Sequence, residues 1–185
     1  MLSLENHFLI AMPSLAKTYF ERTLVYMCEH NQDGSMGIVI NQPVGLTLLE
    51  LLKQVDIKTP IDEERGKHIV RAGGPVSEDR GFIIHSFQEG WDSSLTLTPN
   101  LMVTTSTDIL GVLGNDDAPP KVIAALGYAG WDAGQLEDEI QQNSWLTVEA
   151  DEQLLFDTPI HLKWEKALSK LGIESWQLTD NIGHA

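Results

Sequence analysis

The chain has 185 residues, with 12 basic and 27 acidic side chains and a formal charge of −15 at pH 7. With 42% hydrophobic and 21% charged residues, it has the composition of a globular protein, which excludes intrinsic disorder. The length fits one domain, and we expect residues 1–185 to form it. The acidic excess is concentrated in residues 91–185, and no Lys or Arg lies between Lys121 and Lys163. Such a surface repels phosphate backbones, so the sequence disfavours direct nucleic-acid binding.

A single cysteine, Cys28, excludes an internal disulfide and any multi-cysteine metal site, and it favours a reducing compartment. The apolar run at residues 8–12 is not preceded by Lys or Arg and is too short for a signal peptide. No run approaches the ~18 apolar residues of a membrane-spanning helix. We therefore expect a cytoplasmic protein that has no membrane partner.

The first third of the chain predicts three strands and a helix. Residues 8–12 form an apolar strand closed by a proline, and residues 23–29 and 36–40 form a hairpin around a loop at 30–35. Thr47 and Glu50 have the spacing of a capping box, which predicts a short helix up to about residue 55. Residues 58–67 are charged and predict an exposed loop.

The rest of the chain predicts clustered strands with a few short helices. Further strands are expected at residues 68–71, 82–85, 95–98, 101–105, 122–126, 145–148 and 153–156. Helices are expected from Ser106 or Thr107 to Leu113, at residues 135–142, and at 162–171, where Gly172 ends the last one. Because strands cluster and do not alternate regularly with helices, the sequence predicts an α+β fold.

Cys28 and His30 are the most suggestive pair of reactive residues. If they lie on one strand, their side chains project from the same face, and the imidazole could lower the pKa of the thiol. Cysteine is, however, among the most buried residue types, and no protease or redox signature surrounds this one. We therefore favour a structural role for Cys28 and keep a Cys28/His30 enzyme as an alternative.

Three further segments could border a binding site. The bend at residues 73–81, with Gly73, Gly74 and Arg80, could hold an anion, or it could be a tight turn in which Ser77 caps one helical turn. In residues 127–131, glycines permit unusual dihedral angles or close backbone approach, and Trp131 could line a cleft or complete the core. The hydroxyl-rich segment around Thr105 is explained by helix capping.

No metal or cofactor site is expected. The six histidines are scattered, and none of them forms the closely spaced pair that metal ligands often adopt. The helix near residues 48–55 carries only Lys53 as a cation and has no partner helix at the spacing of a helix-turn-helix motif. This also weighs against DNA recognition.

Several blocks of sequence, in this order, resemble the bacterial YqgE/AlgH family over nearly the whole chain. They are FLIAMPSL (8–15), CEHNQDGSMGIVINQP (28–43), GGPV (73–76), RGFIIHS (80–86), TTSTDIL (104–110), LGYAGWDAGQLEDEI (126–140), NSWL (143–146) and LLFDTP (154–159). Arg71 departs from the aromatic or small residue that relatives commonly carry before GGP. The resemblance implies an α+β fold with a curved, largely antiparallel or mixed sheet and flanking helices. The resemblance assigns no catalytic residues to positions of this chain. One branch of the family is called a transcriptional regulator of alginate synthesis.

The sequence thus predicts a non-enzymatic regulatory or binding protein whose partner is another protein or a small molecule. A groove is predicted from Cys28, His30, Gly73, Gly74, Arg80, Thr105 and Trp131. A direct DNA-binding regulator and a Cys28/His30 enzyme are the alternatives.

Overall fold

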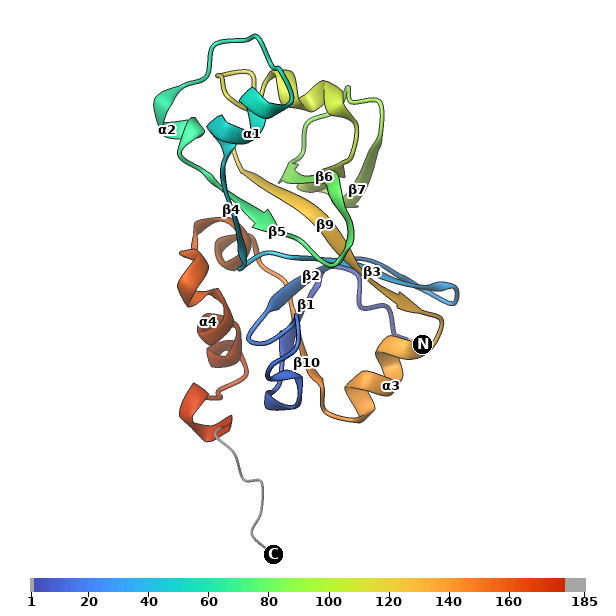
Figure 1. Cartoon of the computed structure of the whole chain (residues 1–185). Helices are drawn as coiled ribbons and strands as arrows, with labels where there is room; N and C mark the ends of the chain where they lie inside the picture. The colour runs from blue at the N-terminus through green and yellow to red at the C-terminus, as the bar shows by residue number, and fades with distance from the viewer. Residues whose placement is uncertain (1, 179–185) are drawn as a thin grey trace, which may run out of the picture. The chain divides into compact units, whose positions relative to one another are not determined.

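The computed structural model describes residues 2–178 (Figure 1). They fall into two compact units, unit 1 (residues 2–41 and 129–178) and unit 2 (residues 42–128). The expectation of a single domain stays a prediction. Among the described helices, none is both long and apolar enough to cross a membrane.

Unit 1 is built on an antiparallel sheet. Its strands are β1 (His7–Ala11), β2 (Leu24–Asn31), β3 (Gly34–Val39), the last part of β9 (Val122–Asp132) and β10 (Trp145–Glu149), in the order β10-β1-β2-β3-β9. Its helices and helical turns are η1 (Pro13–Leu15), α3 (Gln135–Gln141), the π-helical η3 (Gln153–Asp157), η4 (Ile160–Leu162), α4 (Lys163–Lys170) and η5 (Ser175–Leu178).

Both faces of this sheet are covered, because every residue from Phe8 to Ala11 in β1 is buried. Figure 1 shows α3 and α4 on either side of these strands. Leu136 of α3 belongs to the core that contains Leu9 and Trp145. On α4, Trp164 is buried, and its indole N–H donates to the carbonyl of Ala11 at 3.0 Å. The two helices therefore close a two-sided core around the sheet.

The hairpin of β2 and β3 is tighter than the sequence predicts. Asn31 pairs with Gly34, so the connection is a two-residue turn and not a loop over residues 30–35. The register also shifts between Met27 and Glu29, which makes Cys28 the extra residue of a β-bulge. The parity argument that placed Cys28 and His30 on one face assumed a regular strand, and the bulge removes that assumption.

Unit 2 surrounds the first part of β9. Its strands are β4 (Pro43–Thr47), β5 (Ile69–Ala72), β6 (Val76–Ser86), β7 (Ser94–Thr98) and β8 (Leu101–Thr104), and its helices are α1 (Leu48–Gln54), α2 (Glu63–Gly66) and the 3-10 helix η2 (Thr107–Gly111). β9 pairs in parallel with β5 and antiparallel with β6, and the order continues through β8 to β7. Across both units, the α+β fold with a largely antiparallel, mixed sheet is confirmed.

Two sequence signals for helix ends, a capping box and a terminating glycine, are confirmed. Thr47 accepts the Glu50 N–H while the Glu50 carboxylate accepts the Thr47 N–H, so the capping box is present. Gly172 follows α4 with φ +73°. Its N–H donates to the carbonyl of Ser169, and the N–H of Ile173 donates to the carbonyl of Leu168. Those two bonds are the Schellman pattern that ends helices at glycine.

Three further predictions of local structure are wrong. The expected loop at residues 58–67 contains α2, which Asp62 caps by accepting the Arg65 N–H. Ser77 caps no helical turn, because β6 already begins at Val76 and Ser77 lies in it with φ +48°. The expected strand at residues 153–156 is the π-helical turn η3.

Gly127 lies where β9 passes close to another backbone segment of unit 2. Its φ is +80°, and a Cβ there would lie 2.4 Å from the carbonyl oxygen of Gly74. Any other residue would have to push the two segments apart. Both the unusual dihedral angle and the close approach expected for this glycine are confirmed.

Candidate functional site

The predicted groove residues divide between the two units. Cys28, His30 and Trp131 belong to unit 1, whereas Gly73, Gly74, Arg80 and Thr105 belong to unit 2. Each set is described within its own unit. The groove that would join them stays a prediction.

Cys28 is not placed as a nucleophile. Its side chain is buried, and burial, with the nearby Glu29 carboxylate, raises the pKa of the thiol. The thiol lies 4.0 Å from the carbonyl oxygen of Tyr26, to which it points its weak donor. A protonated, buried thiol is inert. This geometry supports the structural reading of Cys28.

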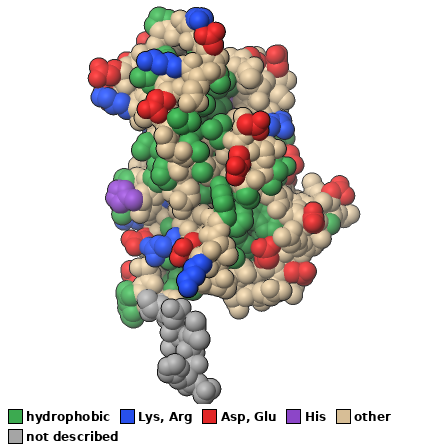
Figure 2. All heavy atoms as spheres, viewed as in Figure 1, with side chains coloured by type: hydrophobic (Ala, Val, Ile, Leu, Met, Phe, Trp, Pro, Cys, Tyr) green, Lys and Arg blue, Asp and Glu red, His purple; other side chains and the backbone are tan. Residues whose placement is uncertain are grey.

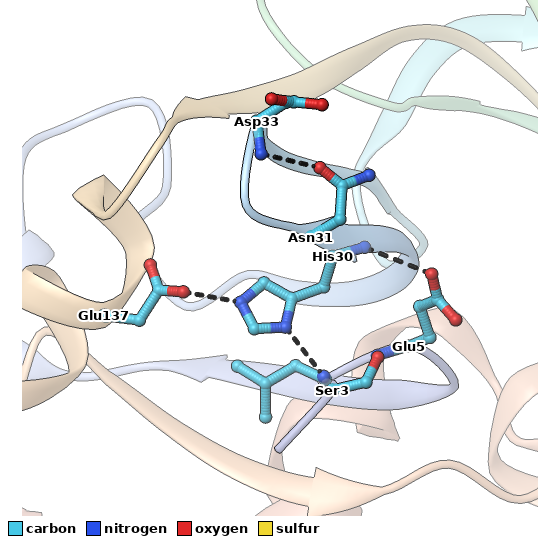
Figure 3. A network of polar contacts seen from close by, with 7 residues as sticks. Ser3, Glu5, His30, Asn31, Asp33 and Glu137 are labelled. Carbon is cyan, nitrogen blue, oxygen red and sulfur yellow. Dashed lines mark hydrogen bonds and ion pairs between the residues drawn. The ribbon is translucent and has the colours of Figure 1, made fainter. Parts of the chain in front are cut away.

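His30 is the centre of a polar network that ties three segments together (Figure 3). Its Nδ1 accepts the backbone N–H of Leu4 at 2.9 Å, and its Nε2 lies 2.7 Å from the Glu137 carboxylate of α3. Its own N–H bonds the carboxylate of Glu5. Because Nδ1 accepts a hydrogen bond from the Leu4 N–H, Nε2 carries the ring proton and donates it in the hydrogen bond to Glu137. Both ring nitrogens are therefore engaged, and neither serves Cys28.

Trp131 completes the core of unit 1. It is 6% exposed, stacks on Phe20 with ring centroids 6.4 Å apart, and meets Trp145 edge-on at 6.0 Å. Aromatic contacts of this kind stabilise a core. Of the two roles expected for Trp131, the packing supports the structural one.

The glycine-rich bend of unit 2 is buried only at its first two residues. Gly73 and Gly74 are buried, and the Gly73 N–H donates to the carbonyl of Leu126 at 2.7 Å. That amide is therefore not available to an anion. Arg80 is exposed, and its guanidinium carbon lies 5.5 Å from the centre of the Phe82 ring.

Thr105 lies in a hydrogen-bonded corner between β8 and η2. Its N–H donates to the carbonyl of Ser93 at 2.9 Å, while the Ser93 N–H donates to the Ser106 hydroxyl at 3.0 Å. Ser106 makes no cap bond to η2; it donates instead to Asp108. That hydrogen bond, followed by backbone N–H donors, lowers the pKa of Asp108. Among residues 2–178, no three His, Cys, Asp or Glu side chains gather closely enough to hold a metal ion.

A hollow of about 210 Å³ opens on unit 1, at a place that the sequence did not single out. We call it the Arg22 hollow; it is lined by Ala11, Met12, Pro13, Ala16, Glu21, Arg22, Trp164, Ser175 and Leu178. Six of these nine residues are apolar. Arg22 provides the cation, Glu21 a carboxylate and Ser175 a hydroxyl.

Arg22 is held over the wall of the hollow. Its guanidinium carbon lies 4.1 Å from the centre of the Trp164 ring, within cation–π range. One of its nitrogens lies 3.5 Å from Glu165. The backbone of Arg22 is left-handed, with φ +53°, and its carbonyl accepts the side-chain N–H of Asn41 at 2.9 Å. No local sequence pattern predicts this arrangement, because Trp164 and Arg22 are far apart in the chain.

The surface of unit 1 is otherwise acidic. Its described residues include 14 Asp and Glu but only five Lys and Arg, of which Lys163 is fully buried. In the space-filling view, acidic side chains gather on the surface around α3 (Figure 2). The Arg22 guanidinium is therefore one of the few exposed cations on an acidic unit.

Comparison with known proteins gives a consistent result. A family model described as AlgH-like matches residues 8–176. A UPF0301 protein of Vibrio cholerae is 52% identical over the whole of both chains, and one of Pseudoalteromonas translucida is 49% identical, also over the whole of both.

Solved structures share the fold. The solution structure of the AlgH protein from Pseudomonas aeruginosa matches with a TM-score of 0.80 and 43% identity, over 99% of this chain and 96% of that one. A crystal structure of a protein from Corynebacterium diphtheriae matches with a TM-score of 0.70 and 16% identity, over 92% and 88% of the two chains. The second likeness concerns the fold alone.

Proposed function

This chain belongs to the AlgH-like family, and from that premise we propose that it is a regulatory or binding protein that acts in the cytoplasm. Its partner is a protein or a small molecule that presents an anionic group beside an apolar body. The binding site is the Arg22 hollow. The observation that carries the proposal is the guanidinium of Arg22 over the Trp164 ring, at the wall of a hollow that apolar and polar side chains line together.

The chemistry of Arg22 favours a carboxylate or phosphate group. A guanidinium has five N–H donors in a fixed fork, more than the single long contact with Glu165 uses. Both of those side chains are about half exposed, at 58% and 49%, so their ion pair contributes little stability and competes weakly with a ligand. Stacking on Trp164 orients the fork before a ligand arrives, which lowers the entropic cost of binding.

The size of the hollow and the charge of the chain limit the partner. A volume of about 210 Å³ is below the roughly 300–1,000 Å³ of pockets that enclose drug-sized ligands. The hollow therefore suits one small anion or one protein side chain or terminus. A net charge of −15 repels extended polyanions, so a single anionic group fits better than a nucleic acid.

The test uses the full chain with benzoate and inorganic phosphate as probes. We expect benzoate at millimolar concentration to shift the side-chain NMR signals of Arg22 Nε–H and Trp164 indole N–H. Arg22→Gln should abolish the shifts, because it removes the cation, whereas Lys17→Gln removes an exposed cation of the same unit and should preserve them. The absence of shifts with either probe in the wild-type chain, or equal shifts in both variants, would overturn the proposal.

A further inference from the structure

A second buried histidine, His85, lies in unit 2 and plays no part in the proposed binding site. It is on β6 and is fully buried. Its Nδ1 lies 2.8 Å from the carbonyl oxygen of Ser86. A carbonyl only accepts, so Nδ1 carries the proton and Nε2 presents a lone pair.

That lone pair faces a chain of two hydroxyls. Thr104 Oγ1 lies 2.7 Å from His85 Nε2, and Ser94 Oγ lies 2.7 Å from Thr104 Oγ1. Because the Thr104 proton is directed to the imidazole, Ser94 is the donor in the outer bond. The direction of donation is therefore from Ser94 to Thr104 and from Thr104 to His85.

The sheet fixes this order in space. β6, β8 and β7 are neighbours, Ser94 pairs directly with Thr104, and His85 pairs with the residue two positions before Thr104. All three side chains thus share one sheet face. Burial decreases outward, since His85 and Thr104 are fully buried and Ser94 is exposed.

The segment before Ser94 is also held in place. The Asp92 N–H donates to the Asp108 carboxylate at 2.8 Å, and the Ser93 N–H donates to the Ser106 hydroxyl at 3.0 Å. Two bonds to the start of η2 therefore fix the backbone that leads into β7. A hydroxyl on a rigid strand, with a base aligned behind it, is the geometry of an activated nucleophile.

We propose that Ser94 is a nucleophilic serine whose hydroxyl is activated by His85 through Thr104, and that it takes an acyl group from activated esters. Ser94 Oγ bonds to the acyl carbon, and the bond from that carbon to the leaving oxygen breaks. The Ser94 proton passes to Thr104 as the Thr104 proton passes to His85 Nε2. The imidazolium then returns its proton to Thr104, whose hydroxyl passes one to the leaving oxygen, so an ester and Ser94 become acyl-Ser94 and an alcohol.

The backbone around Ser94 indicates one acylation and not rapid turnover. The N–H groups of Asp92, Ser93 and Thr105 already have acceptors within the fold. They are therefore not free to stabilise an oxyanion, which is often the largest catalytic contribution. General-base assistance alone supplies roughly 10²- to 10⁴-fold. Burial lowers the pKa of His85, which keeps the imidazole in its neutral, accepting form near pH 7.

The test treats the full chain with p-nitrophenyl acetate at pH 7.5 and maps acetyl groups by peptide mass spectrometry. Ser93 is the internal control, because it is an exposed serine next to Ser94. We expect one acetyl group on Ser94, formed about 10²-fold faster than on Ser93. Acetylation confined to lysines or the N-terminus, or equal rates at the two serines, would overturn the proposal without any variant.

Variants separate activation from simple exposure. Thr104→Val removes the connecting hydroxyl and should slow Ser94 acetylation about 10²-fold, while Thr104→Ser keeps the hydroxyl and should preserve most of the rate. Circular dichroism confirms that each variant is folded. An unchanged rate in folded Thr104→Val would contradict the relay.

Discussion

Each unit buries one histidine among its described residues, and the two imidazoles hydrogen-bond in opposite ways. In unit 1, Nδ1 of His30 accepts a backbone N–H, and Nε2 donates to the Glu137 carboxylate. In unit 2, Nδ1 of His85 donates to a backbone carbonyl, and Nε2 accepts a hydroxyl. The first ring fastens segments together, whereas the second directs a lone pair toward the surface.

The difference shows that residue type and burial do not decide what a histidine does. The exposed fractions are 5% for His30 and 0% for His85, so burial does not distinguish them. The tautomer distinguishes the two histidines, and it depends on whether Nδ1 is hydrogen-bonded to a donor or to an acceptor. The two residues considered as nucleophiles differ accordingly. Cys28 is buried, and both ring nitrogens of the nearby His30 are already hydrogen-bonded, whereas Ser94 is exposed at the end of the hydrogen-bonded relay.

The largest expected effect concerns Cys28. In the native chain at pH 8, we expect its thiol to react with 5,5′-dithiobis(2-nitrobenzoate) roughly 10³-fold or more slowly than in the chain unfolded in urea, because reaction requires opening of a stable core. Burial raises the pKa of this thiol, so it stays protonated at that pH. Absorbance at 412 nm follows the reaction. A native rate within tenfold of the unfolded rate would restore the thiol as a candidate nucleophile.

The next effect tests whether His30 fastens unit 1. His30→Ala leaves the Leu4 N–H and the Glu137 carboxylate without their partner. We expect the free energy of unfolding to fall by about 3 kcal/mol, measured by urea denaturation. His7→Ala is the matched control, because His7 bonds only the nearby carbonyl of Glu5, and it should cost less than about 1 kcal/mol. Equal losses in the two variants would mean that the network adds little.

The smallest effect separates the charge of Glu137 from its hydrogen bond. Its backbone N–H and the His30 imidazole lower the pKa of Glu137 below its ordinary value of 4.5. The stability that this carboxylate provides is therefore complete above about pH 4.5 and is lost as pH falls through the folded pKa. Glu137→Gln keeps an accepting oxygen and should cost less than about 1 kcal/mol at pH 7.

The measurement for Glu137 is the urea midpoint at several pH values. The difference between wild type and Glu137→Gln should be largest near pH 7 and should shrink as pH falls below 4.5 and through the lowered pKa of the folded carboxylate, where Glu137 becomes protonated. A difference that does not vary with pH would assign the whole effect to packing.

Much of the fold follows from local sequence signals. The capping box of Thr47 and Glu50, the glycine stop at Gly172 and the paired strands β2 and β3 were all predicted from neighbouring residues. Each depends on contacts that span a few positions. Short-range chemistry alone therefore recovers these elements.

The error at residues 153–156 occurs where distant residues decide the structure. The π-helical turn η3 looks like a strand in the sequence, yet the buried ammonium of Lys163 donates to the carbonyls of Leu154 and Leu155 at 2.8 and 2.6 Å. These bonds satisfy carbonyls of the turn from outside it. No pattern within residues 153–157 records that partner.

The candidate sites were unpredictable for the same reason. The Arg22 hollow needs Trp164, which is brought to Arg22 by the packing of α4 on the sheet. The relay needs the registers of β6, β8 and β7, which place His85, Thr104 and Ser94 on one face. Sequence spacing favoured Cys28 with His30 because they are two positions apart, and a single bulge undid that argument.

The discontinuity of unit 1 has a consequence for biosynthesis. Its sheet needs β9 and β10, which the ribosome makes only after the whole of unit 2. Until residue 149 has emerged, the outer edge of β1 lacks the strand that pairs with it, although β1 is among the most apolar segments of the chain. Nascent chains therefore expose an unpaired, aggregation-prone strand edge during translation.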